Sequence, residues 1–481
     1  MAQDQSTIKL LEALDIRPRR DDGAAVRAKA APGSEGRFLA FLSDQDGFGL
    51  ETVVELKRLL RTDPARMLAT APALLGPNPT VAQAQVLLDE AEIALRRPAL
   101  TLEIVTANRD APPFELPPEH RFEGYDTTEI PIRPEQTKFE EFADFPAWAV
   151  TAIDAWAFRL THEKATFVHH ASSSTSFVYP LATSGGEATV ALFSDWGTGY
   201  YHAQYIAKHI GRMAPGQAIH LGDVYYVGKQ SEFAEHFIPI LEKYVTASIP
   251  LFTLNANHEM DSHGLAYFAY LLERHQAAGG RASIHPQEGS YFCLTSNRYQ
   301  VIGIDTAFEK NGRLKNGDQK NWLQARLSEG KSDGKINILL SQNEPFEKKA
   351  QKLLTEDLGT LATNKMIDLW FWGDQHYCAL YPPGPSTPFG GSCIGHGGYP
   401  YRVKDEADFA THLVKPIFSE LETRFPADLD LRTGVGNNGF CVLKLAPSAL
   451  EIRYLDWRNR ERYRITLPVQ DGRLRWPTEP T

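Results

Sequence analysis

The segment Ile219-His220-Leu221-Gly222-Asp223-Val224-Tyr225-Tyr226 is the part of the chain from which its architecture is most readily inferred. An apolar run, Ala218 to Leu221, leads directly into Gly222 and Asp223, as in a buried strand that ends in a tight turn presenting a carboxylate. In an open α/β sheet, ligands bind outside the carboxyl ends of the strands. We therefore expect Asp223 to lie where it can hold a metal ion.

Other strand-like runs of the chain also end in oxygen or nitrogen donors. These runs are residues 187–193, 249–254, 336–340 and 367–372, and the donors that follow them are Asp195, Asn257, His258, Gln342, Asn343, Asp374 and His376. Asp, Asn and His are the ligands that a hard or borderline divalent cation needs. The alternation of these strands with helical segments predicts a sheet covered by helices.

The motifs resemble those of the calcineurin-like metallophosphoesterase superfamily. They are Asp195-Trp196-Gly197, Gly222-Asp223-Val224-Tyr225-Tyr226, Asn257-His258-Glu259 and Gly373-Asp374-Gln375-His376, in this order. Gly197 and Tyr226 resemble the purple acid phosphatase variant of the signature. The resemblance covers roughly residues 185–400 and implies an α/β fold, a mixed β-sandwich flanked by helices.

The resemblance also implies roles for individual residues. Asp195 and His376 match ligands of a first metal, and Asp223 matches the carboxylate that bridges two metals. Tyr226 matches the tyrosine that takes the place left vacant at Gly197.

Further matches concern the second metal and the substrate. Asn257 matches the amide ligand of the second metal, and His258 matches the histidine that contacts the substrate phosphate and is the candidate proton donor. His263 and His396, both flanked by glycine, are weaker candidates for lining the substrate pocket.

Two positions depart from the family pattern. Relatives carry His after the strand that ends at Leu340, where this chain has Gln342 and Asn343, and they carry His at the position of Asp374. Both losses fall on the second metal, whose donors become Asp223, Asn257, Asp374 and an amide oxygen, with Gln342 as the candidate. An all-oxygen set shifts preference from Zn and Fe toward Mg, Mn or Ca.

These departures leave three readings open: a two-metal site with altered selectivity, a one-metal enzyme, or a site without catalysis. In a two-metal enzyme the ions lie ~3.5–4 Å apart and generate a nucleophile from bound water. We expect one or two ions, of Mn, Fe, Zn or Mg.

The first expected function is metal-dependent hydrolysis of a phosphomonoester or phosphodiester by a metal-activated hydroxide. The alternative is a degenerate phosphoesterase fold that binds a phosphorylated ligand or a protein without turnover. The chain has no Gly-x-Ser-x-Gly elbow and no Walker phosphate loop, which disfavours rival nucleophile chemistry.

Length and composition suggest an ordinary globular protein with two or three domains at ~150 residues each, since the chain has 481 residues. No apolar run approaches the ~20 residues that span a membrane. The start lacks the pattern of a signal peptide, and four scattered cysteines suit no disulfide framework. We therefore expect a cytoplasmic protein.

The net charge of −10 makes a nucleic-acid partner unlikely, so the expected partner is a small phosphorylated substrate. The sequence gives no indication of oligomeric state.

Two domains are expected. Residues 1–130 read as a mostly helical N-terminal module and linker, with helices near 8–14, 51–61 and 81–96, the last capped by Thr80. Residues 131–481 read as the metallophosphoesterase-like domain, with closing strands at 437–467. Within it, the Gly- and Pro-rich residues 382–402 predict a loop, and residues 405–425 predict a helix.

Two more histidine positions are assigned structural roles. The pair His169-His170 could bind a metal, but the sequence places no partner residue nearby. His220 lies inside a strand and is expected to be a structural histidine.

Overall fold

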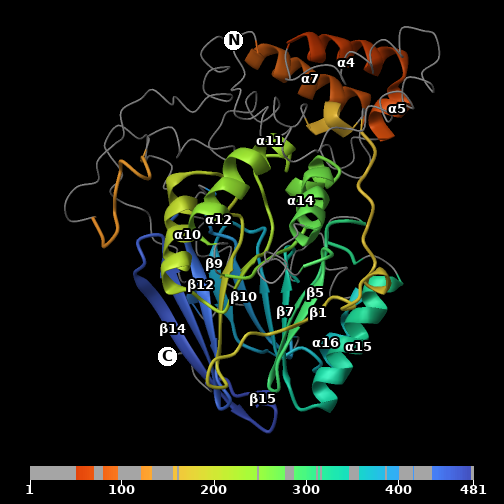
Figure 1. Ribbon diagram of the computed structural model, residues 1–481. Coiled ribbons are helices and arrows are strands. Elements are labelled where there is room, and N and C mark those ends of the chain that lie inside the picture. The colour runs from red at the N-terminus through yellow and green to blue at the C-terminus, as the bar shows by residue number, and fades with distance from the viewer. Residues whose placement is uncertain are drawn as a thin grey trace.

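Figure 1 presents the computed structural model of the chain. The residues that the structure describes are 50–69, 80–95, 121–132, 155–159, 162–245, 249–276, 287–309, 312–314, 317–345, 357–384, 387–399, 415–416 and 436–477.

Two β-sheets form the centre of the molecule. The first is an eight-stranded sheet with the order β1-β5-β6-β7-β8-β10-β9-β11. Its strands are β1 (Val178–Pro180), β5 (Phe292–Thr295), β6 (Tyr299–Gly303), β7 (Ile336–Ser341), β8 (Leu369–Trp372), β9 (Cys378–Tyr381), β10 (Gly390–Ile394) and β11 (Lys415–Pro416).

The second sheet has seven strands in the order β15-β14-β13-β12-β2-β3-β4. Its strands are β2 (Ala188–Phe193), β3 (Gln217–His220), β4 (Leu251–Thr253), β12 (Gly439–Leu445), β13 (Ala449–Asp456), β14 (Glu461–Gln470) and β15 (Arg473–Leu474). The closing strands predicted at the C-terminal end are confirmed as the antiparallel run β12-β13-β14.

Both sheets are mixed, and each has a parallel core. In one sheet β2, β3 and β4 run parallel, with Val190 opposite Gln217 and Ala218 opposite Leu251. In the other, β6, β7 and β8 run parallel. Parallel strands end at a common edge, so the loops after β2 and β3 lie together, as do those after β7 and β8.

Helices cover these strands, which explains why β3, β4, β7 and β8 are buried along their whole length. Figure 1 shows α10 and α12 beside the seven-stranded sheet, and α15 and α16 beside the eight-stranded one. The helices of this part are η3 (His170–Ser172), α10 (Tyr201–Met213), α11 (Gln230–Glu232), the π-helix η4 (Phe233–Phe237), α12 (Ile238–Tyr244), α13 (Asn257–Asp261), α14 (Leu265–Gln276), α15 (Asp318–Ser332) and α16 (Gly359–Thr363). The fold is therefore the mixed, helix-flanked β-sandwich that the sequence predicts.

The N-terminal helices are α4 (Leu50–Thr62), α5 (Pro64–Ala69) and α7 (Val81–Leu95). Thr80 caps α7 as predicted: its hydroxyl accepts from the N–H of Gln83, whose side-chain oxygen accepts from the N–H of Thr80. Lys57 joins α4 to α7 through ion pairs with Asp89 and Glu92. The helix predicted near 8–14 lies outside the described residues.

Two local predictions are wrong. Residues 382–402 do not form only a loop, because they contain β10, which pairs with both β8 and β9. Its glycines fit a buried strand, since a Cβ on Gly390 would lie 1.9 Å from the ring of Trp476. Of the segment 405–425, predicted as a helix, the described residues 415–416 are strand β11; the remainder lies outside the described residues.

Among the helices of the described ranges, none is both long and apolar enough to cross a membrane.

Candidate metal centre

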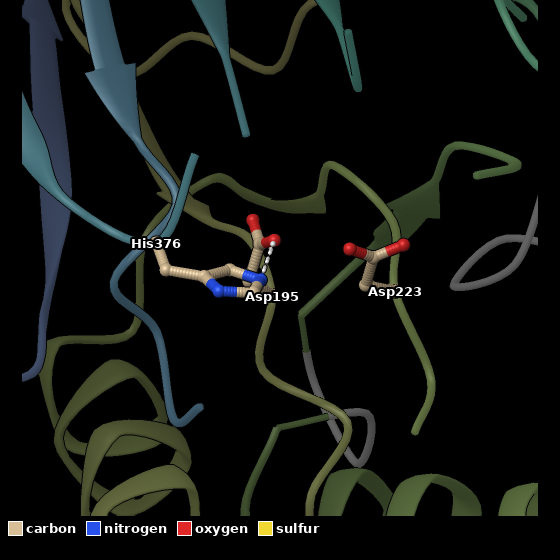
Figure 2. Close-up of side chains that lie close together, drawn as sticks. All are labelled: Asp195, Asp223 and His376. Carbon is tan, nitrogen blue, oxygen red and sulfur yellow. Dashed lines mark ion pairs between the residues drawn. The ribbon is translucent and has the colours of Figure 1, made fainter. Parts of the chain in front are cut away.

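Asp195, Asp223 and His376 come together at the strand ends. One ligand atom from each lies within 4.8 Å of the others, and no further group of three or more His, Cys, Asp or Glu among the described residues meets this condition. Asp195 follows β2, Asp223 follows β3, and His376 follows β8 in the other sheet. Figure 2 shows the carboxylate of Asp195 beside the imidazole of His376, with the carboxylate of Asp223 to their right.

The turns that carry these residues adopt unusual backbone conformations. Asp195, Asp223 and Asp374 have φ angles of 54°, 76° and 64°. Such left-handed conformations are uncommon for residues other than glycine, although Asp tolerates them better than most, and they cluster at functional sites. Backbone hydrogen bonds hold them: the N–H of Asp195 donates to Gly222 O at 3.0 Å, and the N–H of Gly197 donates to Asp223 O at 3.1 Å.

Two glycines of the motifs leave room for this packing. A Cβ on Gly197 would lie 2.6 Å from the backbone of Val224, and a Cβ on Gly373 would lie 2.0 Å from Ser194 Oγ and 2.6 Å from Asp195 Oδ2. The structure thus gives a steric reason for glycine at both positions. Position 197 has no room here for any side chain without a shift of the turn after β3.

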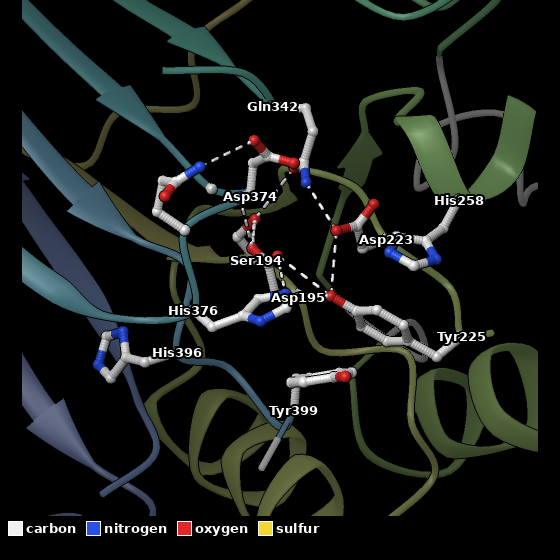
Figure 3. Close-up of polar contacts among 12 residues, drawn as sticks. Ser194, Asp195, Asp223, Tyr225, His258, Gln342, Asp374, His376, His396 and Tyr399 are labelled. Carbon is white, nitrogen blue, oxygen red and sulfur yellow. Dashed lines mark hydrogen bonds and ion pairs between the residues drawn. The ribbon is translucent and has the colours of Figure 1, made fainter. Parts of the chain in front are cut away.

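Tyr225 supplies a fourth group to the cluster. Its hydroxyl lies 3.1 Å from Asp195 Oδ1, 3.0 Å from Asp223 Oδ2 and 3.0 Å from His376 Nε2 (Figure 3). The motif resemblance predicts Tyr226 at this place, and the hydroxyl that the structure brings there is that of the preceding residue. A phenol has one hydrogen to donate, so it cannot satisfy both carboxylates at once.

The buried charges of the two carboxylates act on each other. Burial, together with the negative charges of Asp195 and Glu259, raises the pKa of Asp223 well above its usual value. Burial also opposes ionisation of Asp195, but the hydrogen bond and positive charge of His376 outweigh it and lower the pKa of Asp195. Both carboxylates are almost fully buried, so a cation between them would offset the unfavourable free energy of burying two negative charges close together.

Two oxygen atoms of the residues expected to bind metal lack hydrogen-bond partners within the described part of the chain. Asp223 Oδ1 and Asn257 Oδ1 are buried and have no hydrogen-bond partner among the described residues. Buried polar atoms almost always have a hydrogen-bond partner, so each buried oxygen without one needs a specific explanation. A metal ion held by Asp195, Asp223 and His376 would supply one for Asp223, so the donor set fits a metal.

Asn257 and His258 open helix α13 directly after β4. His258 Nδ1 contacts the carbonyl oxygen of Tyr226, and its ring centroid lies 4.5 Å from that of Tyr225. A carbonyl only accepts, so Nδ1 carries the hydrogen and Nε2 is the nitrogen left to meet a substrate. Burial lowers the pKa of His258.

The candidate ligands of a second metal are arranged less favourably. Gln342 directs its amide N–H to Asp223 Oδ2 at 2.8 Å, so its nitrogen, not its oxygen, faces that carboxylate. Asn343 Oδ1 accepts from the hydroxyl of Thr306 at 2.8 Å. Asp374 donates its backbone N–H to Asp195 Oδ2 at 3.1 Å, while its carboxylate accepts from Gln375.

The weaker histidine candidates lie in other surroundings. His263 Nε2 contacts the carbonyl of Arg159 at 3.1 Å. His396 is fully buried, its pKa is lowered to about 3 by burial, and Figure 3 shows it on the far side of His376 from Asp223. His220 is buried against Thr253, as expected of a structural histidine.

His169 and His170 have a partner that is distant in the sequence. Asp318, at the start of α15, lies 2.8 Å from His169 Nδ1 and 3.2 Å from His170 Nδ1, and also accepts from the hydroxyl of Tyr291. The expectation that no partner lies nearby is therefore wrong, because the fold joins segments about 150 residues apart.

Comparison with known proteins finds a family that matches part of the chain. Residues 188–378 match the family model of calcineurin-like phosphoesterases. This segment contains Asp195, Asp223, Asn257, His258, Asp374 and His376, and the match confirms the resemblance seen in the motifs. No curated protein matches the sequence of the chain.

Solved structures similar to the chain include GAP50, the anchor in the inner membrane complex of Plasmodium. It is 14% identical, with a TM-score of 0.40, over 59% of this chain and 89% of that one. An uncharacterized predicted phosphoesterase from Streptococcus pneumoniae is 7% identical, with a TM-score of 0.27, over 60% and 100% of the two chains. A Thermus thermophilus protein is 13% identical, with a TM-score of 0.29, over 59% and 99%.

Proposed function

We propose that the chain is a metal-dependent phosphoesterase that hydrolyses a small phosphomonoester or phosphodiester. The observation that carries the proposal is the group formed by the buried carboxylates Asp195 and Asp223 and the half-buried His376, in which one oxygen of Asp223 has no partner among the described residues. The match of residues 188–378 to calcineurin-like phosphoesterases supports a phosphoesterase-type function.

The proposed ion is Mn, Fe, Zn or Mg, held by Asp195, Asp223 and His376, with the hydroxyl oxygen of Tyr225 in reach of the same place. Such an ion polarises the phosphoryl group and lowers the pKa of coordinated water. The chain holds the donors at fixed distances because the turns after β2 and β3 are hydrogen-bonded to each other. The donors then need no rearrangement during the reaction.

His258 is the proposed proton donor to the leaving oxygen. The donor is the doubly protonated imidazole: its Nδ1–H is fixed on Tyr226 O, and Nε2 carries the proton that is transferred. A positioned acid contributes most when the leaving group is a poor one, because the leaving oxygen then needs the proton in the transition state. Asn257, the preceding residue, has a buried amide oxygen without a hydrogen-bond partner among the described residues.

One observation favours the alternative, a non-catalytic phospho-ligand or protein-binding module. Asp223 accepts a hydrogen bond from Gln342, Asp195 accepts one from Ser194, and the single hydrogen of the Tyr225 hydroxyl is within reach of either carboxylate. These donors offset part of the cost of burying the carboxylates without an ion.

The decisive experiment measures metal content together with hydrolysis of para-nitrophenyl phosphate and bis(para-nitrophenyl) phosphate. We expect bound metal and turnover in the natural protein. Asp223→Asn is expected to lose more than about 100-fold in turnover, since even groups that only orient metal ligands are worth ~10–100-fold. Asp318→Asn, a matched change away from the site, is expected to retain activity. Metal binding without turnover of either ester would favour the alternative.

We also propose a cytoplasmic location and a small phosphorylated substrate. The four cysteines are free and buried, which suits a reducing compartment. The net charge of −10 disfavours nucleic acid as the partner.

A further inference from the structure

The loop after Asp223, residues 224–229, is wrapped around a single carboxylate. Glu232 accepts hydrogen bonds from the backbone N–H groups of Tyr226, Val227 and Lys229. The N–H of Val227 lies 3.1 Å from Oε2 and 3.3 Å from Oε1, and that of Lys229 lies 2.8 Å from Oε2. Hydrogen bonds to an ionised carboxylate are stronger than those between neutral groups.

Helix capping explains only part of this arrangement. In a capping box, the carboxylate at the third helical position accepts from the N–H of the N-cap residue, and Glu232 does so for Lys229 at the start of α11. Capping does not call for the additional hydrogen bonds from Tyr226 and Val227, which lie before the helix. Glu232 therefore holds the loop as well as the helix.

Three carbonyl groups of the same loop are in contact with two histidines and a serine. Tyr226 O accepts from His258 Nδ1, Tyr225 O lies 3.2 Å from His236 Nδ1, and Gly228 O accepts from Ser262 Oγ at 2.7 Å.

One peptide group links Glu232 to His258. The carbonyl of Tyr226 and the N–H of Val227 belong to the same planar unit, whose two polar atoms point in opposite directions when it is trans. The N–H end is bonded to Glu232 and the carbonyl end to His258. Fixing one end fixes the other, and a negative charge at the N–H end strengthens the carbonyl as an acceptor.

We propose that Glu232 is a positioning residue for His258: through the Tyr226–Val227 peptide it keeps hydrogen on Nδ1 and fixes the direction of Nε2. In the protonated ring Nε2 carries the proton that passes to the leaving oxygen, and this transfer returns the ring to the Nδ1–H tautomer. This inference rests on the proposed function for its catalytic consequence, but not for its structural one. Glu232 touches neither the metal ligands nor Nε2 of His258 among the described contacts. Its effect on the reaction is therefore indirect.

The structural consequence is tested by NMR of protein labelled with nitrogen-15 in its histidine rings, in which the two tautomers give distinct patterns. His258→Gln identifies the His258 signals by their loss. We expect the Nδ1–H pattern for His258 in the natural protein. In Glu232→Gln we expect a mixture of tautomers, because the amide nitrogen of glutamine cannot accept the hydrogen bonds that the N–H groups of the loop donate. Glu242→Gln, an exposed change on α12, is the matched control and should leave the pattern intact. An unchanged His258 pattern in Glu232→Gln would overturn the proposal.

The catalytic consequence is tested with a good and a poor leaving group. Glu232→Gln is expected to lose ~10–100-fold more kcat on an alkyl phosphate than on para-nitrophenyl phosphate, because only the alkyl oxygen needs a proton from His258. KM and metal content should stay unchanged. Equal losses on both esters, or a loss of metal, would show a merely structural role and overturn the proposal.

A second variant and the NMR comparison cover two possible failures. If Glu232→Gln does not fold, Glu232→Asp, which keeps the charge but is one methylene shorter, carries the same comparison. If the natural protein hydrolyses neither ester, the proposed function fails, while the NMR comparison still decides whether Glu232 positions His258.

Discussion

The hydroxyl of Tyr225 lies 3.0 Å from Nε2 of His376, although the two residues are 151 positions apart in the chain. The same oxygen contacts Asp195 and Asp223, so the phenol occupies the centre of the cluster rather than its rim. Any ion held by these donors would have the phenol oxygen as a neighbour.

Tyr225→Phe should therefore weaken metal binding. The hydroxyl oxygen is a fourth donor in reach of the ion, and a contact with a charged group contributes about 1.5–3 kcal/mol, so without it the dissociation constant for the metal should rise by roughly tenfold or more. Calorimetric titration of chelator-treated protein measures this. Tyr226→Phe is the control and should bind metal as the natural protein does. A larger effect at position 226 than at 225 would contradict the arrangement in Figure 3.

Gly373→Ala should disturb the centre directly. The new methyl carbon would lie 2.0 Å from Ser194 Oγ and 2.6 Å from Asp195 Oδ2, so the Asp195 carboxylate has to move. We expect metal affinity to fall at least tenfold and unfolding to become easier by about 1–3 kcal/mol, the usual cost of overpacking. Gly384→Ala, whose methyl would meet only Thr387 Oγ1 at 3.6 Å, should change neither quantity. Full metal affinity in Gly373→Ala would argue against Asp195 as a ligand.

Restoring the two family histidines should change the metal count. In Gln342→His/Asp374→His, two imidazoles replace an amide that donates to Asp223 and a carboxylate beside it. We expect the natural protein to bind about one ion per chain and the double variant about two, measured by elemental analysis. Gln375→His, next to the same turn, tests whether any added histidine has this effect. Two ions already present in the natural protein would show that the oxygen donors suffice.

The metal-free protein should lose stability as the pH falls, through His220. Burial lowers the pKa of His220 to about 3, whereas in the unfolded chain it is near 6.5. Between these values the unfolded state binds a proton that the folded state does not, so the stability present above about pH 6.5 is lost on the way down to about pH 3. The full shift corresponds to a few kcal/mol.

Urea unfolding at pH 7 and pH 5, with chelator present, measures this slope. His220→Gln should flatten it, because glutamine does not titrate. A slope unchanged by the substitution would assign the pH dependence to other buried histidines, such as His209, whose pKa burial lowers to about 4.

The sequence sufficed to predict the residues that follow strands. Asp195, Asp223 and His376 each lie just past an apolar run, and parallel strands bring such positions to one edge. Helices α4 and α7 could be predicted for a similar reason, because apolar spacing and the cap at Thr80 are local signals.

Other features depend on the path of the chain in space. Spacing does not say which of two adjacent tyrosines in a loop turns inward, and here it is Tyr225 whose hydroxyl reaches Asp195 and Asp223. Strand β10 was missed because glycine disfavours strands in isolation, whereas here the ring of Trp476 requires it. The contact of Asp318 with His169 joins segments that no local pattern connects.

Asp195 and Asp223 follow strands of the seven-stranded sheet, whereas His376 follows a strand of the eight-stranded one. An ion held by all three would thus act as a cross-link between two layers that otherwise meet mainly through apolar packing. A cross-link between distant segments restricts the unfolded chain and ties the separation of the sheets to release of the ion. Loading with metal should therefore slow unfolding of both sheets together, rather than only stiffen the turns that touch the ion.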